Sequence, residues 1–462
     1  MRRLVVVSNR VAVPDDGQAR AGGLAVALHE ALQQNGGVWF GWSGRITPHS
    51  SNAPHILDSG PVTFATLDLS RKDHAEYYNG FANRSLWPVF HYRMDLADFN
   101  RQNYQGYLRV NTLFADQLRP LLREDDDIWV HDYHLIPLGE ELRRLGLRQR
   151  MGFFLHTPFP AMEVLLVLPS AGRIIRSLCA YDVVGFQTSN DLRAFHDMIT
   201  LELGGEVLSN GLVRAFGRTL KAEVFPIGID VAPMVQSAEN SPRLASTKRL
   251  RRNFKDIKLM IGVDRLDYSK GLPERFKAFE RFLEKYPVWR GKVSFMQIAP
   301  ASRADVPEYM QIRLQLEAEA GHINGRFAEF DWTPMHYLSS SFQRHTLAGF
   351  YRFSPVGVVT PLRDGMNLVA KEYVAAQNGD DPGVLVLSRF AGAARELGSA
   401  LQVNPYDLEG VADVLLRALD MPIEERRDRW QDLMRAVRAS SLDHWRDSFL
   451  KALREAPYSV ET

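Results

Sequence analysis

The segment 356–372, V-G-V-V-T-P-L-R-D-G-M-N-L-V-A-K-E, combines an apolar run, a turn and two carboxylates in a short stretch. The valine-rich start predicts a buried parallel strand, and the pattern after the turn predicts a helix. Asp364 then lies where the strand gives way to the helix, which is where ligands of open α/β sheets bind. The first helical turn presents backbone N–H groups to an anion, those of Asn367, Leu368 and Val369. Glu372 lies one turn farther on, so the segment suits a ligand that carries both hydroxyl groups and a phosphate.

Each carboxylate also has a simpler interpretation, Asp364 as a helix N-cap and Glu372 as a solvated charge. The functional interpretation gains weight because polar residues follow four other predicted strands: Arg10, Asp132, His156, and Arg265 together with Lys270. A histidine such as His156 is, by itself, more often part of a core. Two doubly wound domains that face each other across a cleft would bring all of these strand ends together.

Arg265 and Lys270 offer two cations beside a predicted helix start. Arginine can bind phosphate oxygens in a bidentate manner and lysine acts as a point charge, so the pair suits a diphosphate without a fixed metal. The alternative is a surface ion pair with Asp264 or Asp267.

Two weaker signals also point to phosphate. Gly22 and Gly23 stand between the first strand and a helical pattern, which describes either a phosphate cradle or a plain turn. Arg303 follows the predicted strand 293–298 much as Arg10 follows the first strand.

The acidic triplet 125–127 contains the D-x-D spacing that metal-dependent sugar transferases use. It precedes the predicted strand 128–130, so it belongs to the sheet edge opposite the ligand crevice. We therefore interpret it as a solvated loop and expect no metal site.

The stretch 76–93 is unusually aromatic, which is more often a sign of core than of a site. Tyr78 and Trp87 nevertheless each carry a polar tip on an apolar body, a combination that suits a sugar ring.

Strand-like runs alternate with helical patterns in both halves of the chain, which predicts an α/β fold with parallel sheets. The runs are residues 4–7, 38–42, 62–67, 128–130, 152–155, 183–187 and 222–229, then 258–263, 293–298, 356–360 and 384–387. Residues 232–248 lose strand character and contain several Pro, Ser and Asn, so we place a domain boundary there. The predicted domains cover residues 1–235 and 236–445, and a C-terminal helix covers 446–462.

The length, net charge and cysteine count of the chain limit its fold and its partners further. A chain of 462 residues is too long for one core. A net charge of +1 gives no overall field for nucleic acid or a membrane surface, so any phosphate site must be local. The single cysteine, Cys179, excludes an internal disulfide. No apolar run reaches the length of a membrane span or a signal peptide, so we expect a cytoplasmic protein.

Seven motifs agree in type and order with one known family: L-V-V-V-S-N-R, W-F-G-W-S-G, L-W-P-V-F-H-Y-R, I-W-V-H-D-Y-H-L, G-F-F-L-H-T-P-F-P, R-L-D-Y-S-K-G-L-P-E-R and P-L-R-D-G-M-N-L-V-A-K-E. Over nearly its whole length the chain resembles the trehalose-6-phosphate synthases, retaining glycosyltransferases of family 20. The resemblance implies a GT-B α/β fold with two Rossmann-like domains and a C-terminal helix that packs back on the N-terminal domain. It also implies transfer of glucose from a nucleotide glucose, usually UDP-glucose, to glucose 6-phosphate, which gives α,α-trehalose 6-phosphate.

The resemblance further implies roles for single residues. The acceptor phosphate would lie near Arg10, Tyr78 and Arg303, and the acceptor sugar near Asp132 and Trp87. The donor diphosphate would contact Gly22, Gly23, Arg265, Lys270 and the backbone around Asn367, Leu368 and Val369. The transferred glucose would contact His156 and Asp364, the ribose Glu372, and the base Phe342. The residues expected to act in catalysis are Asp132, His156, Arg265, Lys270 and Asp364, with no metal or organic cofactor, in a homo-oligomer (dimer or tetramer).

Several alternatives stay open. The base of the donor could be UDP, GDP or ADP, and the acceptor could be another phosphorylated molecule, such as glycerol 3-phosphate. A synthase-like subunit without activity is a further possibility, although the retained polar set argues against it. The chain departs from the family at Ala161-Met162 and over 339–347. No carboxylate stands out as a nucleophile, so we expect a front-face reaction in which Asp132 orients the acceptor.

Overall fold

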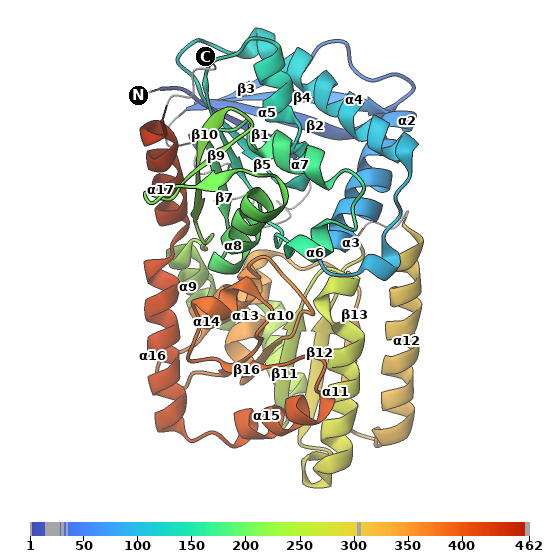
Figure 1. Cartoon of the computed structure of the whole chain (residues 1–462). Helices are drawn as coiled ribbons and strands as arrows, with labels where there is room; N and C mark the ends of the chain where they lie inside the picture. Colours follow the sequence, from blue (N-terminus) through green and yellow to red (C-terminus); the bar gives the residue numbers. More distant parts are fainter. Residues whose placement is uncertain (1, 14–27, 29–31, 34–35, 303–305, 458–462) are drawn as a thin grey trace. The chain divides into compact units, whose positions relative to one another are not determined.

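The computed structural model of the chain describes residues 2–13, 28, 32–33, 36–302 and 306–457 (Figure 1). The chain divides into two units, Met1–Ile227 with Asp443–Thr462, and Gly228–Leu442. Each unit is built on its own largely parallel sheet, as the alternation of strand and helix patterns predicts.

The first unit contains a 10-stranded sheet in the order β3-β4-β2-β1-β5-β6-β7-β10-β9-β8. The strands are β1 (Leu4–Arg10), β2 (Gly37–Thr47), β3 (His55–Ser59), β4 (Val62–Ser70), β5 (Asp127–His131), β6 (Arg150–Phe154), β7 (Val183–Phe186), β8 (Glu206–Val207), β9 (Leu212–Ala215) and β10 (Arg218–Val224). The strands from β4 to β10 run parallel, and the chain reverses its direction of winding between β1 and β5. Such a reversal opens a crevice at the carboxyl ends of the two strands.

The longer helical segments of this unit are the π-helix η1 (His74–Leu86), α3 (Trp87–Phe90), α4 (Arg101–Leu118), α5 (Leu138–Arg144), α6 (Met162–Leu165), α7 (Ala171–Leu178), α8 (Ser189–Asp197) and α17 (Leu442–Glu455). The C-terminal helix α17 packs on the sheet of this unit. Its Phe449 ring stacks on Trp129 at 4.7 Å. A Cβ at Gly152 would lie 2.6 Å from the Phe449 ring, and one at Gly185 would lie 2.9 Å from it. Glycine at both positions is therefore what allows the helix to approach the strands.

The second unit contains a 6-stranded sheet in the order β13-β12-β11-β14-β15-β16, in which every recorded pairing is parallel. The strands are β11 (Lys258–Val263), β12 (Val293–Ile298), β13 (Met335–Leu338), β14 (Val356–Val359), β15 (Val384–Ser388) and β16 (Leu401–Val403). The helices are α9 (Val231–Asn240), α10 (Ala245–Asn253), α11 (Leu272–Lys285), α12 (Pro307–Phe327), α13 (Arg344–Phe353), α14 (Leu368–Ala376), α15 (Leu408–Asp420) and α16 (Ile423–Ala439). Here the winding reverses between β11 and β14, the strands that precede Arg265 and Asp364.

The segment 232–248 is not the irregular connection that its composition predicts. It falls within α9, a short 3-10 turn and α10, and the division between the units lies earlier, after Ile227. Met234 and Ala238 of α9 are buried, so an apolar stripe holds this helix to its unit despite the Pro and Ser residues. The strand expected over 222–229 also ends early, at Val224.

The interpretation of the acidic triplet as a solvated loop is wrong for two of its three residues. Asp126 is buried and forms a 2.6 Å ion pair with Arg3. Asp127 is fully buried and accepts a 3.0 Å hydrogen bond from Nε of Arg454 in α17. Only Asp125 is exposed. Asp126 and Asp127 thus bind residues near the two ends of the chain, Arg3 and Arg454. This role could not be predicted locally, because both partners are distant in sequence.

Within the described residues, no helix has both the length and the apolar character required to cross a membrane.

Candidate functional site

The first polar cluster lies at the carboxyl ends of β1, β5 and β6, beside the reversal of winding in the first unit. Arg10 ends β1, Asp132 follows β5, and His156 follows β6. Because β1 pairs with β5 and β5 pairs with β6, the topology brings these three strand ends side by side.

Asp132 is held in a backbone conformation that L-residues rarely adopt, with φ 73° and ψ 165°. Its N–H donates to the Phe154 carbonyl at 2.9 Å, and its Oδ1 accepts the N–H of His156 at 3.2 Å. Such a conformation costs on the order of 1–3 kcal/mol and is concentrated at functional sites. The half-buried carboxylate is therefore fixed in direction at the end of the strand.

Arg10 presents an exposed cation beside this carboxylate-bearing loop. Its guanidinium forms no hydrogen bond or ion pair with the residues that the structure describes. A Cβ at Gly44, where φ is +91°, would lie 2.8 Å from Arg10 Nε. The guanidinium thus occupies space that only a glycine leaves open, and it is available to bind an anion.

An aromatic wall connects Tyr78, Trp87 and Asp132. Tyr78 stacks on the His134 ring, with 5.7 Å between the ring centroids and 12° between the ring planes. Trp87 packs against Tyr133, with 5.5 Å between the ring centroids. Tyr133 and His134 directly follow Asp132 in the chain. The π-helix η1, which carries Tyr78, and the following helix α3, which begins at Trp87, therefore bring the two predicted sugar-contacting aromatics to the strand end that carries the carboxylate.

His156 adds a half-buried imidazole that stays neutral. Its Nε2 lies 3.1 Å from Nδ1 of His131. Burial lowers the pKa of His156 to about 3, and burial likewise lowers the pKa of His131. One imidazole can therefore donate a hydrogen bond to the other, but neither contributes a positive charge at neutral pH.

The second polar cluster lies at the reversal of winding in the second unit. Lys270, in the 3-10 turn η7 (Tyr268–Lys270), donates from Nζ to Asp364 Oδ2 at 2.6 Å. Asn367 Nδ2 donates to the same oxygen at 3.0 Å. Asp364 lies beyond β14 and Lys270 beyond β11, so the two loops meet although 94 residues separate them.

The simpler interpretations of these residues do not describe the structure. Helix α14 begins at Leu368 with Asn367 as its N-cap, so Asp364 is not the cap. The Asn367 side chain accepts no capping hydrogen bond from the first turn, whose N–H groups include those of Leu368 and Val369. Glu372 is half-buried and lies 3.6 Å from Arg344, and burial raises the pKa of its carboxyl group. It is therefore not a freely solvated charge.

A buried network supports the loop that carries Lys270. Arg275, which is 2% exposed, donates to Asp264 at 2.5 Å, to Gln297 at 2.8 Å and to Thr360 at 2.9 Å. Its second terminal nitrogen lies 3.3 Å from the carbonyl of Lys270. Asp264 is thus paired with Arg275 rather than with Arg265 or Lys270. Arg275 ends one of the long sequence motifs, but its supporting role was not predicted.

Arg265 is exposed and forms no hydrogen bond or ion pair with the described residues. Phe342, expected near a base, is half-buried and meets Phe350 edge to face at 5.4 Å. Gly22, Gly23 and Arg303 lie outside the described residues. The structure therefore gathers Arg10, Tyr78, Trp87, Asp132 and His156 in one unit and Lys270, Asp364, Asn367 and Glu372 in the other.

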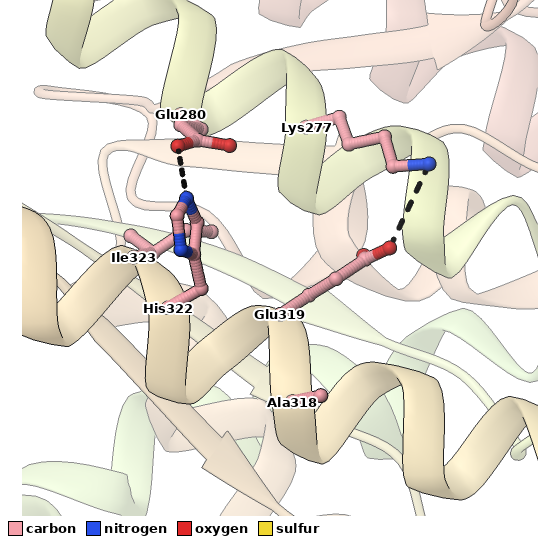
Figure 2. A pocket seen from close by; sticks show the side chains of 6 residues that line it. All are labelled: Lys277, Glu280, Ala318, Glu319, His322 and Ile323. Atoms are coloured by element: carbon pink, nitrogen blue, oxygen red, sulfur yellow. Dashed lines mark hydrogen bonds and ion pairs between the residues drawn. The ribbon is translucent and has the colours of Figure 1, made fainter.

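A separate cavity of about 300 Å³ lies between α11 and α12 (Figure 2) and is lined by Lys277, Glu280, Ala318, Glu319, His322 and Ile323. Its polar side chains pair with one another, Lys277 with Glu319 at 3.6 Å and His322 with Glu280 at 3.1 Å. None of the residues of the two polar clusters lines it. We interpret it as a gap between two helices whose facing polar side chains are already paired.

Among the described residues, no group of three or more His, Cys, Asp or Glu side chains is arranged to hold a metal ion.

The chain is similar in sequence to known proteins. The sequence pattern of the family described as Glycosyltransferase family 20 matches residues 3–455. A curated Trehalose-6-phosphate synthase from Cronobacter sakazakii is 51% identical over 464 residues, which cover 100% of this chain and 97% of the relative.

Solved structures are equally similar. The alpha,alpha-trehalose-phosphate synthase (UDP-forming) of Burkholderia vietnamiensis is 54% identical, with a TM-score of 0.97 over 99% of this chain and 97% of that one. The Burkholderia xenovorans enzyme in complex with glucose-6-phosphate is 53% identical, with a TM-score of 0.94 and coverage of 98% and 100%. The Escherichia coli protein bound with UDP-2-fluoro glucose is 49% identical, with a TM-score of 0.94 and coverage of 98% and 99%. These matches confirm the GT-B α/β class that the sequence predicts.

Proposed function

The chain belongs to glycosyltransferase family 20, and we propose that it transfers glucose from UDP-glucose to glucose 6-phosphate, giving α,α-trehalose 6-phosphate and UDP. The proposal is supported by the names of the relatives and by the ligands in two solved structures, glucose-6-phosphate in one and UDP-2-fluoro glucose in another. The observation that carries it is the pairing of Lys270 with Asp364 at the start of α14, where a cation, a carboxylate and helix N–H groups converge.

The second unit suits the donor. Cleavage of the anomeric bond builds negative charge on the departing diphosphate. Arg265, Lys270 and the N-terminus of α14 would stabilise this charge without a metal, because preorganised donors need no rearrangement as the charge develops. Asp364 would accept hydrogen bonds from hydroxyl groups of the transferred glucose, and Glu372 would accept them from the ribose.

The first unit suits the acceptor. The exposed guanidinium of Arg10, which has no partner among the described residues, would bind the phosphate of glucose 6-phosphate together with Tyr78. The sugar would lie against Trp87, with a hydroxyl group hydrogen-bonded to Asp132. The positive charge of Arg10 thus favours a phosphorylated sugar over a neutral one.

We further propose a front-face reaction with retention of configuration. The departing phosphate oxygen would take the proton of the attacking acceptor hydroxyl while that hydroxyl forms the new bond to the anomeric carbon. Asp132 would orient the acceptor and would not attack, since the His156 N–H holds its Oδ1 in place. A covalent glucosyl-enzyme trapped on Asp132 would contradict this step.

A donor and acceptor panel tests the proposal. The purified chain would be incubated with UDP-, GDP- or ADP-glucose and with glucose 6-phosphate, glucose or glycerol 3-phosphate, and release of the nucleoside diphosphate would be followed. We expect the highest kcat/KM with UDP-glucose and glucose 6-phosphate, and the same rate after treatment with a chelator. Turnover only with glycerol 3-phosphate would instead indicate a related synthase, and no turnover with any pair would indicate a silent subunit.

A further inference from the structure

Two histidines that follow neighbouring strands form an imidazole pair. His131 is the last residue of β5 and is fully buried, whereas His156, which follows β6, is half-buried. His131 Nδ1 lies 3.1 Å from His156 Nε2, so one nitrogen donates a proton to the other. Which one donates decides what His156 offers to a ligand, because a neutral imidazole has one donor and one acceptor nitrogen.

Aromatic rings enclose this pair. The ring centroids of Trp129 and His131 are 4.5 Å apart. The ring centroid of His156 lies 4.7 Å from that of Phe154 and 5.9 Å from that of Trp445 in α17. Among the described residues, three buried nitrogens of this cluster have no hydrogen-bond partner: Nε2 of His131 and Nε1 of Trp129 and of Trp445. The two indole N–H groups can only donate, so the cluster already holds two donors without acceptors.

The unpartnered Nε2 of His131 selects the tautomer. If His156 donated to His131, the proton of His131 would have to lie on Nε2, adding a third buried N–H without an acceptor. Buried N–H groups without a partner are rarer than acceptors with an unused lone pair. The lower-energy arrangement places the His131 proton on Nδ1, which donates to Nε2 of His156. His156 must then carry its own proton on Nδ1.

The Nδ1 of His156 is free to act on a ligand. It forms no hydrogen bond with the described residues and, unlike the three nitrogens above, is not among the fully buried unpartnered atoms. The backbone N–H of the same residue donates to Asp132 Oδ1 at 3.2 Å. His156 is therefore tethered at its backbone and at Nε2, and only Nδ1 remains to make a contact.

We propose that His131 is a positioning residue that fixes His156 as the Nδ1–H tautomer, so that His156 donates a hydrogen bond from Nδ1 to a hydroxyl oxygen of the transferred glucose. The identity of the ligand rests on the proposed function, whereas the tautomer does not.

Tautomers can be measured directly. In protein labelled with ¹⁵N-histidine, long-range ¹H–¹⁵N correlation spectra distinguish a protonated from an unprotonated ring nitrogen, and a His156→Gln variant identifies the signals of His156 among the 13 histidines. We expect a protonated Nδ1 and an unprotonated Nε2 for His156 in the free enzyme. A protonated Nε2 would overturn the proposal, whatever reaction the enzyme catalyses.

A matched pair of variants tests the role of the donor. His131→Asn keeps an N–H near the position of Nδ1, and His131→Leu has a similar shape but no donor. We expect His131→Leu to lose the Nδ1–H preference of His156 and to lower kcat by about tenfold, the scale of one lost hydrogen bond, with the KM for glucose 6-phosphate unchanged. His131→Asn is expected to retain the tautomer and most of the rate. Equal rates in the two folded variants would contradict the proposal. Should His131→Leu fail to fold, loss of the Nδ1–H tautomer in a folded His131→Asn would also contradict it.

Discussion

Replacing Lys270 by methionine removes one cation from the second unit and keeps most of the apolar side chain. Lys270 Nζ lies 2.6 Å from Asp364 Oδ2, and the two side chains are only 11% and 14% exposed, so water screens this charge weakly. A preorganised group that stabilises charge in the transition state contributes about 3–4 kcal/mol. The expected fall in kcat is therefore about 10²–10³-fold. The KM for glucose 6-phosphate is expected to change by less than about threefold, because other strands build the acceptor cluster.

The assay is the initial rate of UDP release, with each substrate varied in turn. Lys277→Met is a matched control, because Lys277 is 50% exposed and pairs with Glu319 on the neighbouring helix, and we expect its kcat to equal that of the wild type. The double variant Lys270→Met with Asp364→Asn separates loss of the cation from the effect of an uncompensated carboxylate. A folded Lys270→Met variant with a kcat within about threefold of wild type would refute the assignment of Lys270 to the leaving group.

Further predictions concern the other cluster and the supporting network. Arg10→Gln should raise the KM for glucose 6-phosphate by about 10–100-fold, the worth of a hydrogen bond to a charged group, with little change in the KM for UDP-glucose. Gly44→Ala should give the same selective rise in KM, because its Cβ would lie 2.8 Å from Arg10 Nε; an unchanged KM would contradict the packing argument. Arg275→Met should lower the free energy of unfolding by about 3–5 kcal/mol in chemical denaturation, since it leaves the buried Asp264 carboxylate without its partner. Burial lowers the pKa of His156 to about 3, so the unfolded chain binds its proton first, and stability should fall as the pH drops below about 6.5. This loss would be smaller in His156→Gln, and an equal loss in both proteins would count against the pKa shift.

Much of the fold could be predicted because a buried parallel strand has a direct signature, a continuous apolar run followed by a polar turn. β1, β11 and β14 follow that rule, and their ends carry Arg10, Arg265 and Asp364. The strand ends therefore indicated where the candidate residues lie along the chain before any spatial arrangement was known.

The partners of these residues could not be predicted, because they depend on strand order and not on local pattern. The contact between Lys270 and Asp364 requires β11 to lie beside β14, and that between His131 and His156 requires β5 to lie beside β6. The ion pair of the buried Asp127 with Arg454 is a further example, since it spans 327 residues.

The helices α9 and α10 show a different limit of sequence patterns. Their Pro, Ser and Asn residues are typical of a loop, but proline is tolerated in the first turn of a helix and polar residues can face solvent. Packing of Met234 and Ala238 then outweighs the weak local preference. A domain boundary inferred from composition alone was consequently displaced toward the C-terminus.

The most direct test of the central claim is the structure of the product formed from UDP-glucose and glucose 6-phosphate. Mass spectrometry and ¹H NMR of the anomeric protons would identify the disaccharide and the configuration at the transferred glucose. We predict α,α-trehalose 6-phosphate and UDP in equal amounts, without added metal. Release of UDP with free glucose as the only sugar product, or a transferred glucose in the β configuration, would contradict the account.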